Sequence, residues 1–299
     1  MHPKNPHNTP YNFTKLIEAH PGLSRFVFEN NYNTTTINFS NPDAVLHLNK
    51  AILKNDYAVV DWEIPPHYLC PPIPGRMDYL CYLSELMEDN SLGLKKSKNK
   101  GRKGLDIGVG ANCIYPILGA QFFGWQMIGA DINETAVAQA KANVSMTSEI
   151  LNKVEIRHQK NNADIFKGII KDDEYFDFTV CNPPFHPSEE AATKGTLRKI
   201  KNLESTGEVR LTKEEITRNF GGQANELWVN GGEALFIKRM IKQSIGFKNQ
   251  VGVFTTLVSN KENLNKLYKQ LDKMKATHRT INMDIGNKRS RMLAWWFLN

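Results

Sequence analysis

From Gly104 to the C-terminus, segments with the pattern of β-strands alternate with segments with the pattern of α-helices. Such an alternation is typical of a parallel sheet with helices on both faces, because two parallel neighbours need a crossover between them. The predicted strands are residues 105–108, 126–131, 154–159, 176–181, 250–257, 279–284 and 292–298. The predicted helices are residues 115–122, 134–151, 232–245 and 261–274.

The last two predicted strands, residues 279–284 and 292–298, leave no room for a helix between them. Two strands joined by a short connection run antiparallel, so the final strand should be the antiparallel member of the sheet. Seven strands with this ending resemble the sheet of class I, Rossmann-like methyltransferases more than a plain dinucleotide-binding sheet. We therefore predict an α/β fold of this class, with a seven-stranded, mostly parallel sheet and an antiparallel last strand.

The residues before this sheet predict a small N-terminal α/β module, residues 1–94. They are rich in Asn, Pro and aromatic side chains, and residues 34–39 have the composition of a short strand. Asn41 and Pro42 are a typical N-cap and first helical residue, so a helix should begin there. A second helix is predicted at residues 76–88.

Two further segments fit neither the strand nor the helix pattern. In residues 95–103, six of nine are Lys or Arg, which predicts a basic linker between the N-terminal module and a second domain, residues 104–299. Residues 186–230 mix basic and acidic side chains with glycines. We predict a mobile insertion there, because a patternless segment of this length inside a compact domain is usually functional or disordered.

The composition favours a polyanionic partner and argues against a membrane or a metal. The net charge is +7 and the isoelectric point is near 9.1. No apolar run approaches the roughly 20 residues of a membrane span, and the N-terminus lacks the apolar stretch of a signal peptide. The four cysteines have no zinc-binding spacing. We expect a cytoplasmic protein that binds no metal and no membrane.

A glycine loop follows the first strand of the predicted sheet. Gly108 and Gly110 allow a sharp turn and let the backbone approach a ligand where side chains would clash, and Asn112 belongs to the same loop. Asp131, at the end of the next strand, is positioned for two ribose hydroxyls. This pair predicts a cofactor site without separating NAD from S-adenosylmethionine. A structural turn with an incidental acid is the alternative interpretation.

Two details favour S-adenosylmethionine. Cys113 stands where a third glycine would help to bind a pyrophosphate, which this cofactor lacks. Asp106 precedes Gly108 by two residues, where its carboxylate can face the cationic end of the cofactor. Asp164, after the third strand, can accept a hydrogen bond from the adenine amine of the cofactor, although an acid on a loop surface explains it equally well.

The most specific motif is Asn182, Pro183, Pro184 and Phe185, directly after the fourth strand. Two prolines and an aromatic residue are costly as mere packing, because prolines remove donors and rigidify the loop. The Asn182 side-chain oxygen and the Pro183 carbonyl can each accept one N–H bond from an exocyclic base amine, which aims its lone pair at a methyl group. Phe185 can stack on the base. We therefore predict that these four residues are catalytic.

Together the motifs resemble those of the adenine-N6 RNA methyltransferases related to bacterial large-subunit methyltransferase F. The resemblance includes Asp-Ile-Gly-Val-Gly-Ala-Asn-Cys-Ile-Tyr-Pro at residues 106–116 and the motif at residues 182–185. It also includes Gly-Gly-Glu at residues 231–233 and Arg-Met-Leu-Ala-Trp-Trp-Phe at residues 291–297. With similar segments upstream, it covers nearly the whole chain.

The resemblance implies S-adenosyl-L-methionine as cofactor and N6-methylation of one adenine of 23S ribosomal RNA, adenine 1618. The partner would be this RNA or an assembly intermediate of the large ribosomal subunit. It also implies that the N-terminal module binds RNA and caps the cofactor, with Arg76 reaching the cofactor carboxylate. Asn182 would contact the cofactor as well as the base.

Other functions share parts of this pattern. The Asn-Pro-Pro-aromatic motif also occurs in guanine-N2 methyltransferases and in glutamine-amide methyltransferases that act on release factors. A catalytically inactive RNA-binding protein is a third alternative, against which the intact Asp106, Gly108, Gly110, Asp131 and Asn182 argue. A dehydrogenase would leave the Asn-Pro-Pro-Phe motif without a role.

Overall fold

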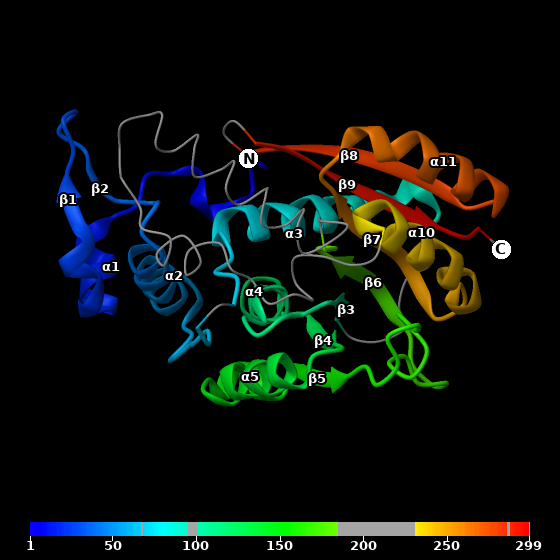
Figure 1. The fold of residues 1–299 in the computed structure, drawn as a ribbon, viewed down its shortest axis with the longest axis horizontal. Helices are drawn as coiled ribbons and strands as arrows, with labels where there is room; N and C mark the ends of the chain where they lie inside the picture. Colours follow the sequence, from blue (N-terminus) through cyan, green and yellow to red (C-terminus); the bar gives the residue numbers. More distant parts are fainter. Residues whose placement is uncertain (67, 95–100, 185–230, 286–287, 299) are drawn as a thin grey trace.

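The computed structural model describes residues 1–66, 68–94, 101–184, 231–285 and 288–298. Its centre is a seven-stranded sheet with the order β5-β4-β3-β6-β7-β9-β8 (Figure 1). The strands are β3 (Lys103–Ile107), β4 (Gln126–Asp131), β5 (Val154–His158), β6 (Phe176–Cys181), β7 (Val251–Val258), β8 (Thr277–Ile285) and β9 (Lys288–Trp296). Within the described ranges, no helix is long and apolar enough to cross a membrane.

Strand β9 runs against the rest of the sheet. β3 pairs in parallel with β4 and β6, β4 with β5, and β6 with β7, whereas β9 is antiparallel to both β7 and β8. The predicted fold, with its antiparallel last strand, is therefore confirmed. At the centre of the sheet, Ile107 at the end of β3 is in register with Cys181 at the end of β6.

Helices cover both faces of the sheet. One face carries α3 (Ile73–Glu88), α4 (Ile114–Phe122) and α5 (Glu134–Ser145), and the other carries α10 (Gly232–Ser244) and α11 (Leu264–Lys273) (Figure 1). Side chains of β9 alternate between the two cores. Met292, Ala294 and Trp296 pack on the first face, and Leu293 and Trp295 pack on the second. Both tryptophans are buried because both faces are covered.

The N-terminal residues add α1 (Phe13–Ala19), α2 (Pro42–Tyr57) and a two-stranded antiparallel sheet of β1 (Val27–Glu29) and β2 (Thr35–Ile37). Their apolar side chains belong to the core of the first sheet face, where Leu48 of α2 is in one cluster with Ile117 of α4 and Met292 of β9. Short 3-10 helices complete the structure: η1 (Pro6–Asn8), η2 (Pro21–Phe26), η3 (Asn90–Leu92), η4 (Ile245–Phe247) and η5 (Lys261–Asn263).

Two predicted elements differ from the structure. The helix predicted at residues 134–151 is interrupted after α5 and resumes as α6 (Ser148–Leu151). Thr147 has extended backbone between them, and its Oγ1 accepts a hydrogen bond from Val60 N at 3.0 Å, so a tertiary contact ends the helix. The strand predicted at residues 34–39 is shorter, and its partner β1 was not predicted.

The buried side chain of Asn143, on α5, ties the N-terminal residues to the loop after β3. Its Nδ2 donates to Glu63 O at 2.9 Å and to Ala111 O at 3.0 Å, and its Oδ1 accepts from Glu63 N at 2.9 Å. The Trp62 Nε1 donates to Asn112 O at 2.7 Å. These four bonds fix one side of the glycine loop against the segment that follows α2.

We expect Asn143→Ala to lower the free energy of unfolding by about 2–4 kcal/mol, because three hydrogen bonds would be lost and the buried bond to Ala111 O is one of them. Chemical denaturation measures this loss. The exposed Asn152 provides a matched control, and Asn152→Ala should change stability by less than about 0.5 kcal/mol. Equal stability of the two variants would contradict the structural role of Asn143.

Candidate active site at the carboxyl ends of the strands

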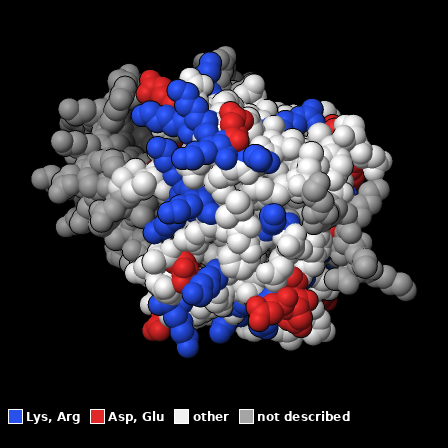
Figure 2. Space-filling model, turned by 90° about the vertical axis from the view of Figure 1, so that its right-hand side faces the viewer, with Lys and Arg blue, Asp and Glu red and all other residues white. Residues whose placement is uncertain are grey.

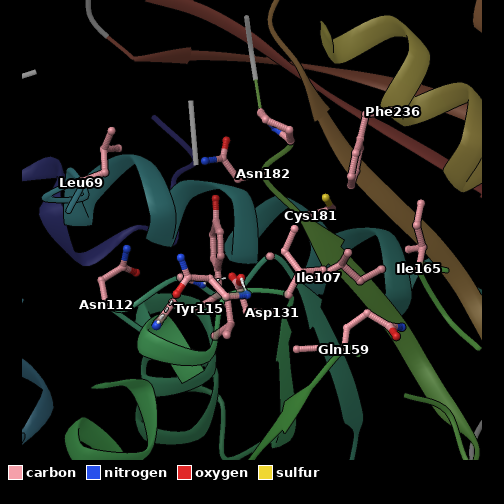
Figure 3. A pocket seen from close by; sticks show the side chains of 18 of the residues that line it. Leu69, Ile107, Asn112, Tyr115, Asp131, Gln159, Ile165, Cys181, Asn182 and Phe236 are labelled. Atoms are coloured by element: carbon pink, nitrogen blue, oxygen red, sulfur yellow. Dashed lines mark hydrogen bonds between the residues drawn. The ribbon is translucent and has the colours of Figure 1, made fainter. Parts of the chain in front are cut away.

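A cavity of about 440 Å³ opens at the carboxyl ends of β3, β4 and β6 (Figure 3). It brings together the glycine loop, the acid after β4 and the motif after β6, which are far apart in the sequence. Eight of the predicted site residues line it: Arg76, Gly108, Gly110, Asn112, Asp131, Asp164, Asn182 and Pro184. Asp106 and Pro183 are buried behind the lining, and Phe185 lies outside the residues that the structure describes.

The glycine loop has a backbone that only glycine adopts easily. Gly108 and Gly110 have φ angles of +76° and +62°. The amides of Gly108 and Val109 both donate to Ala130 O, at 2.9 and 3.0 Å. A Cβ built on Gly108 has no neighbour within 4 Å, so the positive φ angle rather than a lack of space requires glycine there.

Asp131 links the loop after β3 to the loop after β4. Its Oδ2 accepts from Gly110 N and its Oδ1 accepts from Asn133 N, both at 2.9 Å. Burial raises the pKa of Asp131, although the backbone N–H groups oppose this effect. Each carboxylate oxygen can accept further bonds, so Asp131 can hold a pair of ribose hydroxyls while it keeps the loop in place.

Asp106 is a buried carboxylate without a partner. The residue is fully inaccessible, and neither Oδ atom has a hydrogen-bond partner among the described residues. Burial first, and the nearby Asp131 second, raise the pKa of Asp106 well above its ordinary value, and the charge of Arg76 opposes them. An isolated buried carboxylate is costly. Its position beneath the cavity therefore fits a ligand with a cationic group, as S-adenosylmethionine has.

Arg76 reaches the cavity from the first turn of α3. Its Nη1 donates to the Tyr115 hydroxyl at 3.3 Å, and its guanidinium lies 5.6 Å from the centre of that ring. The same turn is fixed from outside, where Asn5 Nδ2 donates to Pro74 O and to Asp78 Oδ1, both at 3.0 Å. This placement suits an anionic group in the cavity, and the contact with a cofactor carboxylate stays a prediction.

Asn182 projects toward the cavity from the end of β6 (Figure 3). Its Oδ1 is buried and has no hydrogen-bond partner among the described residues. A buried carbonyl oxygen without a donor costs stability. Because it lies at a cavity wall, the oxygen is available to accept an N–H group from a bound molecule.

Asp164 also lines the cavity, but its Oδ2 already accepts from Asn161 Nδ2 at 2.7 Å. The second oxygen can still contact a ligand, and this role stays a prediction. Sequence reasoning did not identify several lining residues, including Tyr115, Gln159, Phe236 and Arg239. Phe236 and Arg239 lie one turn apart on α10, shortly after the family-like residues 231–233.

The described residues contain no group of three His, Cys, Asp or Glu side chains that could hold a metal ion. The strand order, the fixed glycine loop and the acid at the end of β4 define the chain as a class I, S-adenosylmethionine-dependent methyltransferase. More particularly, the chain belongs to a family of RNA methyltransferases, whose sequence profile matches residues 1–299.

Two relatives that match over nearly their whole length carry the same name. The Ribosomal RNA large subunit methyltransferase F of Christiangramia forsetii is 55% identical over 298 residues, which cover 99% of this chain and 100% of that protein. The protein of the same name from Bacteroides fragilis is 46% identical over 304 residues, covering 99% of this chain and 98% of the relative.

Solved structures of a human protein share the fold. The catalytic domain of human Mettl16, in complex with the MAT2A 3'UTR hairpin 1, matches with a TM-score of 0.79 and 25% identity, covering 100% of this chain and 96% of that one. The N-terminal domain of human METTL16 in complex with SAH matches with a TM-score of 0.75 and 24% identity, covering 100% and 99%. The latter likeness shows the common fold.

Replacing Asp131 should weaken cofactor binding. Asp131→Ala removes a charged acceptor, and we expect a loss of about 1.5–3 kcal/mol in the binding of S-adenosylmethionine, measured by titration calorimetry. Asp131→Asn keeps one acceptor oxygen, so its affinity for S-adenosylmethionine should fall less than that of Asp131→Ala. The exposed Asp172 is a matched control, whose replacement by Ala should leave affinity unchanged. Tight binding of NAD by the wild type would contradict the cofactor assignment.

The affinity for S-adenosylmethionine should rise with pH. The pKa of Asp106 is raised in the free protein, so its carboxyl group stays protonated at pH values at which an ordinary carboxyl group is charged. A cationic ligand favours the charged form of this carboxyl group. Binding should therefore release a proton in the window between the bound and free pKa values. Calorimetry in buffers of different ionisation enthalpy detects this proton.

The variant Asp106→Asn should bind S-adenosylmethionine more weakly, and its affinity should no longer depend on pH. The exposed control Asp172→Asn should have the affinity and the pH dependence of the wild type. For the free protein the sign is opposite, because charging a buried carboxylate destabilises the fold as pH rises. A cofactor affinity that stays constant across this window in the wild type would show that Asp106 is not linked to the ligand.

Proposed function

We propose that this protein transfers a methyl group from S-adenosylmethionine to the N6 amine of an adenine in ribosomal RNA of the large subunit. The observation that carries the proposal is the buried, unpartnered Asn182 Oδ1 at the wall of a cavity that also contains the glycine loop and Asp131. An exocyclic amine is the kind of group that this oxygen can bind. The membership of the chain in an RNA methyltransferase family supports RNA as the substrate.

The chemical task at the amine is orientation. Its lone pair is delocalised into the base, so it is a poor nucleophile until the N–H bonds are held. Asn182 Oδ1 accepts one N–H bond and the Pro183 carbonyl accepts the other, which favours a pyramidal nitrogen with its lone pair toward the donor. Positioning of this kind can supply much of a rate enhancement. The proposed stacking of Phe185 on the base completes the arrangement.

S-adenosylmethionine supplies a methyl group already activated by the sulfonium charge. The residues of the chain hold it in place: Asp131 takes the ribose hydroxyls, Asp106 faces the cationic end, and Arg76 takes the carboxylate. Asp164 takes the adenine amine. Asn112 and Asn182 are the remaining proposed contacts. No strong general base is needed, because the methylated amine is acidic enough to lose its proton to water.

The choice of substrate rests on the relatives. Two of them, at 55% and 46% identity over nearly their whole length, are named for methylation of large-subunit ribosomal RNA. We infer that the substrate is 23S ribosomal RNA or an assembly intermediate of the large subunit, in the cytoplasm, and that the reaction needs no metal. The alternative products are an N2-methylated guanine and a methylated glutamine amide, and analysis of the reaction product distinguishes them from N6-methyladenine.

We expect Asn182→Ala to lower kcat by on the order of 10²–10³ while the affinity for S-adenosylmethionine stays close to that of the wild type. The loss falls on kcat because the Asn182 oxygen orients the amine as transfer begins. Single-turnover methylation of ribosomal RNA from cells that lack the gene measures the rate. Mass spectrometry of the nucleosides should identify N6-methyladenine.

Thermal melting of the same variant separates this role from a structural one. If Asn182 only stabilises the turn after β6, Asn182→Ala should melt at a lower temperature and keep normal turnover per folded molecule. A well-folded variant with near-normal turnover would therefore refute the mechanism. A product other than N6-methyladenine would refute the choice of base and leave the mechanism of amine methylation standing.

A further inference from the structure

One stretch of the described residues carries a large excess of positive charge. Residues 232–275 contain nine Lys and Arg against three Asp and Glu, a net charge of +6. This stretch forms α10 and α11, on the right-hand side of Figure 1. Figure 2 shows that side of the molecule, where Lys and Arg side chains gather. We call the cationic side chains of residues 238–275 the α10–α11 basic face.

Both helices turn their lysines outward. On α11, the apolar Leu264, Leu267 and Leu271 are buried, whereas lysines at positions 266, 269 and 273 are exposed. On α10, Lys238 and Lys242 are one turn apart and thus on the same side. The Gln270 Nε2 donates to Lys238 O at 2.8 Å and so holds the two helices together. The charges therefore sit on a rigid support.

Neighbouring acids do not neutralise these lysines. Among the described residues, no lysine of the α10–α11 basic face forms an ion pair with an oxygen within 4.0 Å. Buried Glu233 instead accepts from the amides of Ser259 and Asn260, at 2.6 and 3.2 Å. Asp272 pairs with His278 at 3.1 Å. The cations are therefore available to an external anion.

The α10–α11 basic face is continuous with the catalytic cavity. Phe236 and Arg239 of α10 line the cavity, and Lys238 and Lys242 lie beside and one turn beyond Arg239 on the same helix. The Nε of Arg239 is buried and has no hydrogen-bond partner among the described residues. The cations of α10 therefore begin at the wall of the cavity with Arg239 and continue with Lys242 one turn further along the helix.

Two other basic segments lie wholly or partly outside the described residues. Residues 95–103 contain six Lys and Arg and no Asp or Glu, a net charge of +6, but residues 95–100 are not described. Residues 186–230 contain seven Lys and Arg and seven Asp and Glu, so their net charge is zero. Sequence-independent affinity for nucleic acid comes from cations that replace the counterions of phosphates. Among the described residues, the stretch with the largest excess of cations, residues 232–275, is therefore the best candidate for this affinity.

We propose that the α10–α11 basic face binds the phosphate backbone of the RNA that flanks the target adenine, an inference that rests on the proposed function. The target base enters the cavity beside Asn182, and the flanking strand follows α10 toward α11. The contacts are with phosphates, so this face contributes affinity without reading the sequence.

The test compares two double variants that remove the same charge. Lys269→Gln with Lys273→Gln removes two cations from the α10–α11 basic face. Lys141→Gln with Lys153→Gln removes two cations from α5 and from the residue before β5, away from this face (Figure 1). Fluorescence anisotropy measures binding of a 23S ribosomal RNA fragment, transcribed in vitro, over a series of salt concentrations.

The first double variant should bind this RNA about tenfold more weakly and reduce the log–log salt slope by about 1.5, since each lost phosphate contact contributes about 0.7–0.9. The control double variant should keep the wild-type slope. Lys269→Arg with Lys273→Arg retains both charges and should also keep it. Thermal melting and calorimetry with S-adenosylmethionine should be the same for all four proteins.

An unchanged slope in the Lys269 and Lys273 double Gln variant would overturn the inference and leave a solvated surface or a protein partner as the role of this face. An equal reduction in both Gln variants would overturn it too, because the effect would then be one of total charge. Failure of the proposed function appears separately, as a wild-type protein that binds RNA but forms no N6-methyladenine. The two failures are therefore distinguishable.

Discussion

The fixed backbone of the loop from Gly108 to Asn112 is the constraint on which the site depends. Ala130 O accepts hydrogen bonds from its first two amides, and Asp131 accepts one from Gly110 N. Asn143 of α5 and Trp62 donate to its last two carbonyls. A loop that is fixed before the ligand arrives loses little entropy on binding. The ends of β3 and β4 therefore hold this loop in place.

Two polar groups near this loop destabilise the protein while they stand alone. Asp106 and Asn182 have buried side-chain oxygens that lack partners among the described residues. Each costs free energy in folding, and a bound molecule with suitable donors would reduce that cost. The same two groups would therefore lower the stability of the free protein and contribute to ligand binding and catalysis. The covering of both sheet faces by helices provides the stability that tolerates it.

The central part of the fold was predictable because strand and helix periods are local properties. The seven strands, the antiparallel β9 and the placement of Asp131 follow from patterns of a few residues each. The break at Thr147 could not be predicted, because a hydrogen bond from Val60 ends the helix. The roles of Tyr115 and Phe236 in the cavity wall could not be predicted either, because their neighbours in the cavity are distant in sequence. Arg76 was indicated by the family resemblance, and Phe185 lies outside the described residues.

The core that joins Leu48 of α2 to Met292 of β9 has a consequence for the order of synthesis. The N-terminal helices leave the ribosome first, but the strand that completes the same hydrophobic core leaves last. At elongation rates of about 5–20 residues per second, roughly 10–50 s separate the two events. A nascent chain therefore carries uncovered apolar surface for most of its synthesis. A chain that stops just before β9 keeps every cofactor-site residue and still cannot close its core.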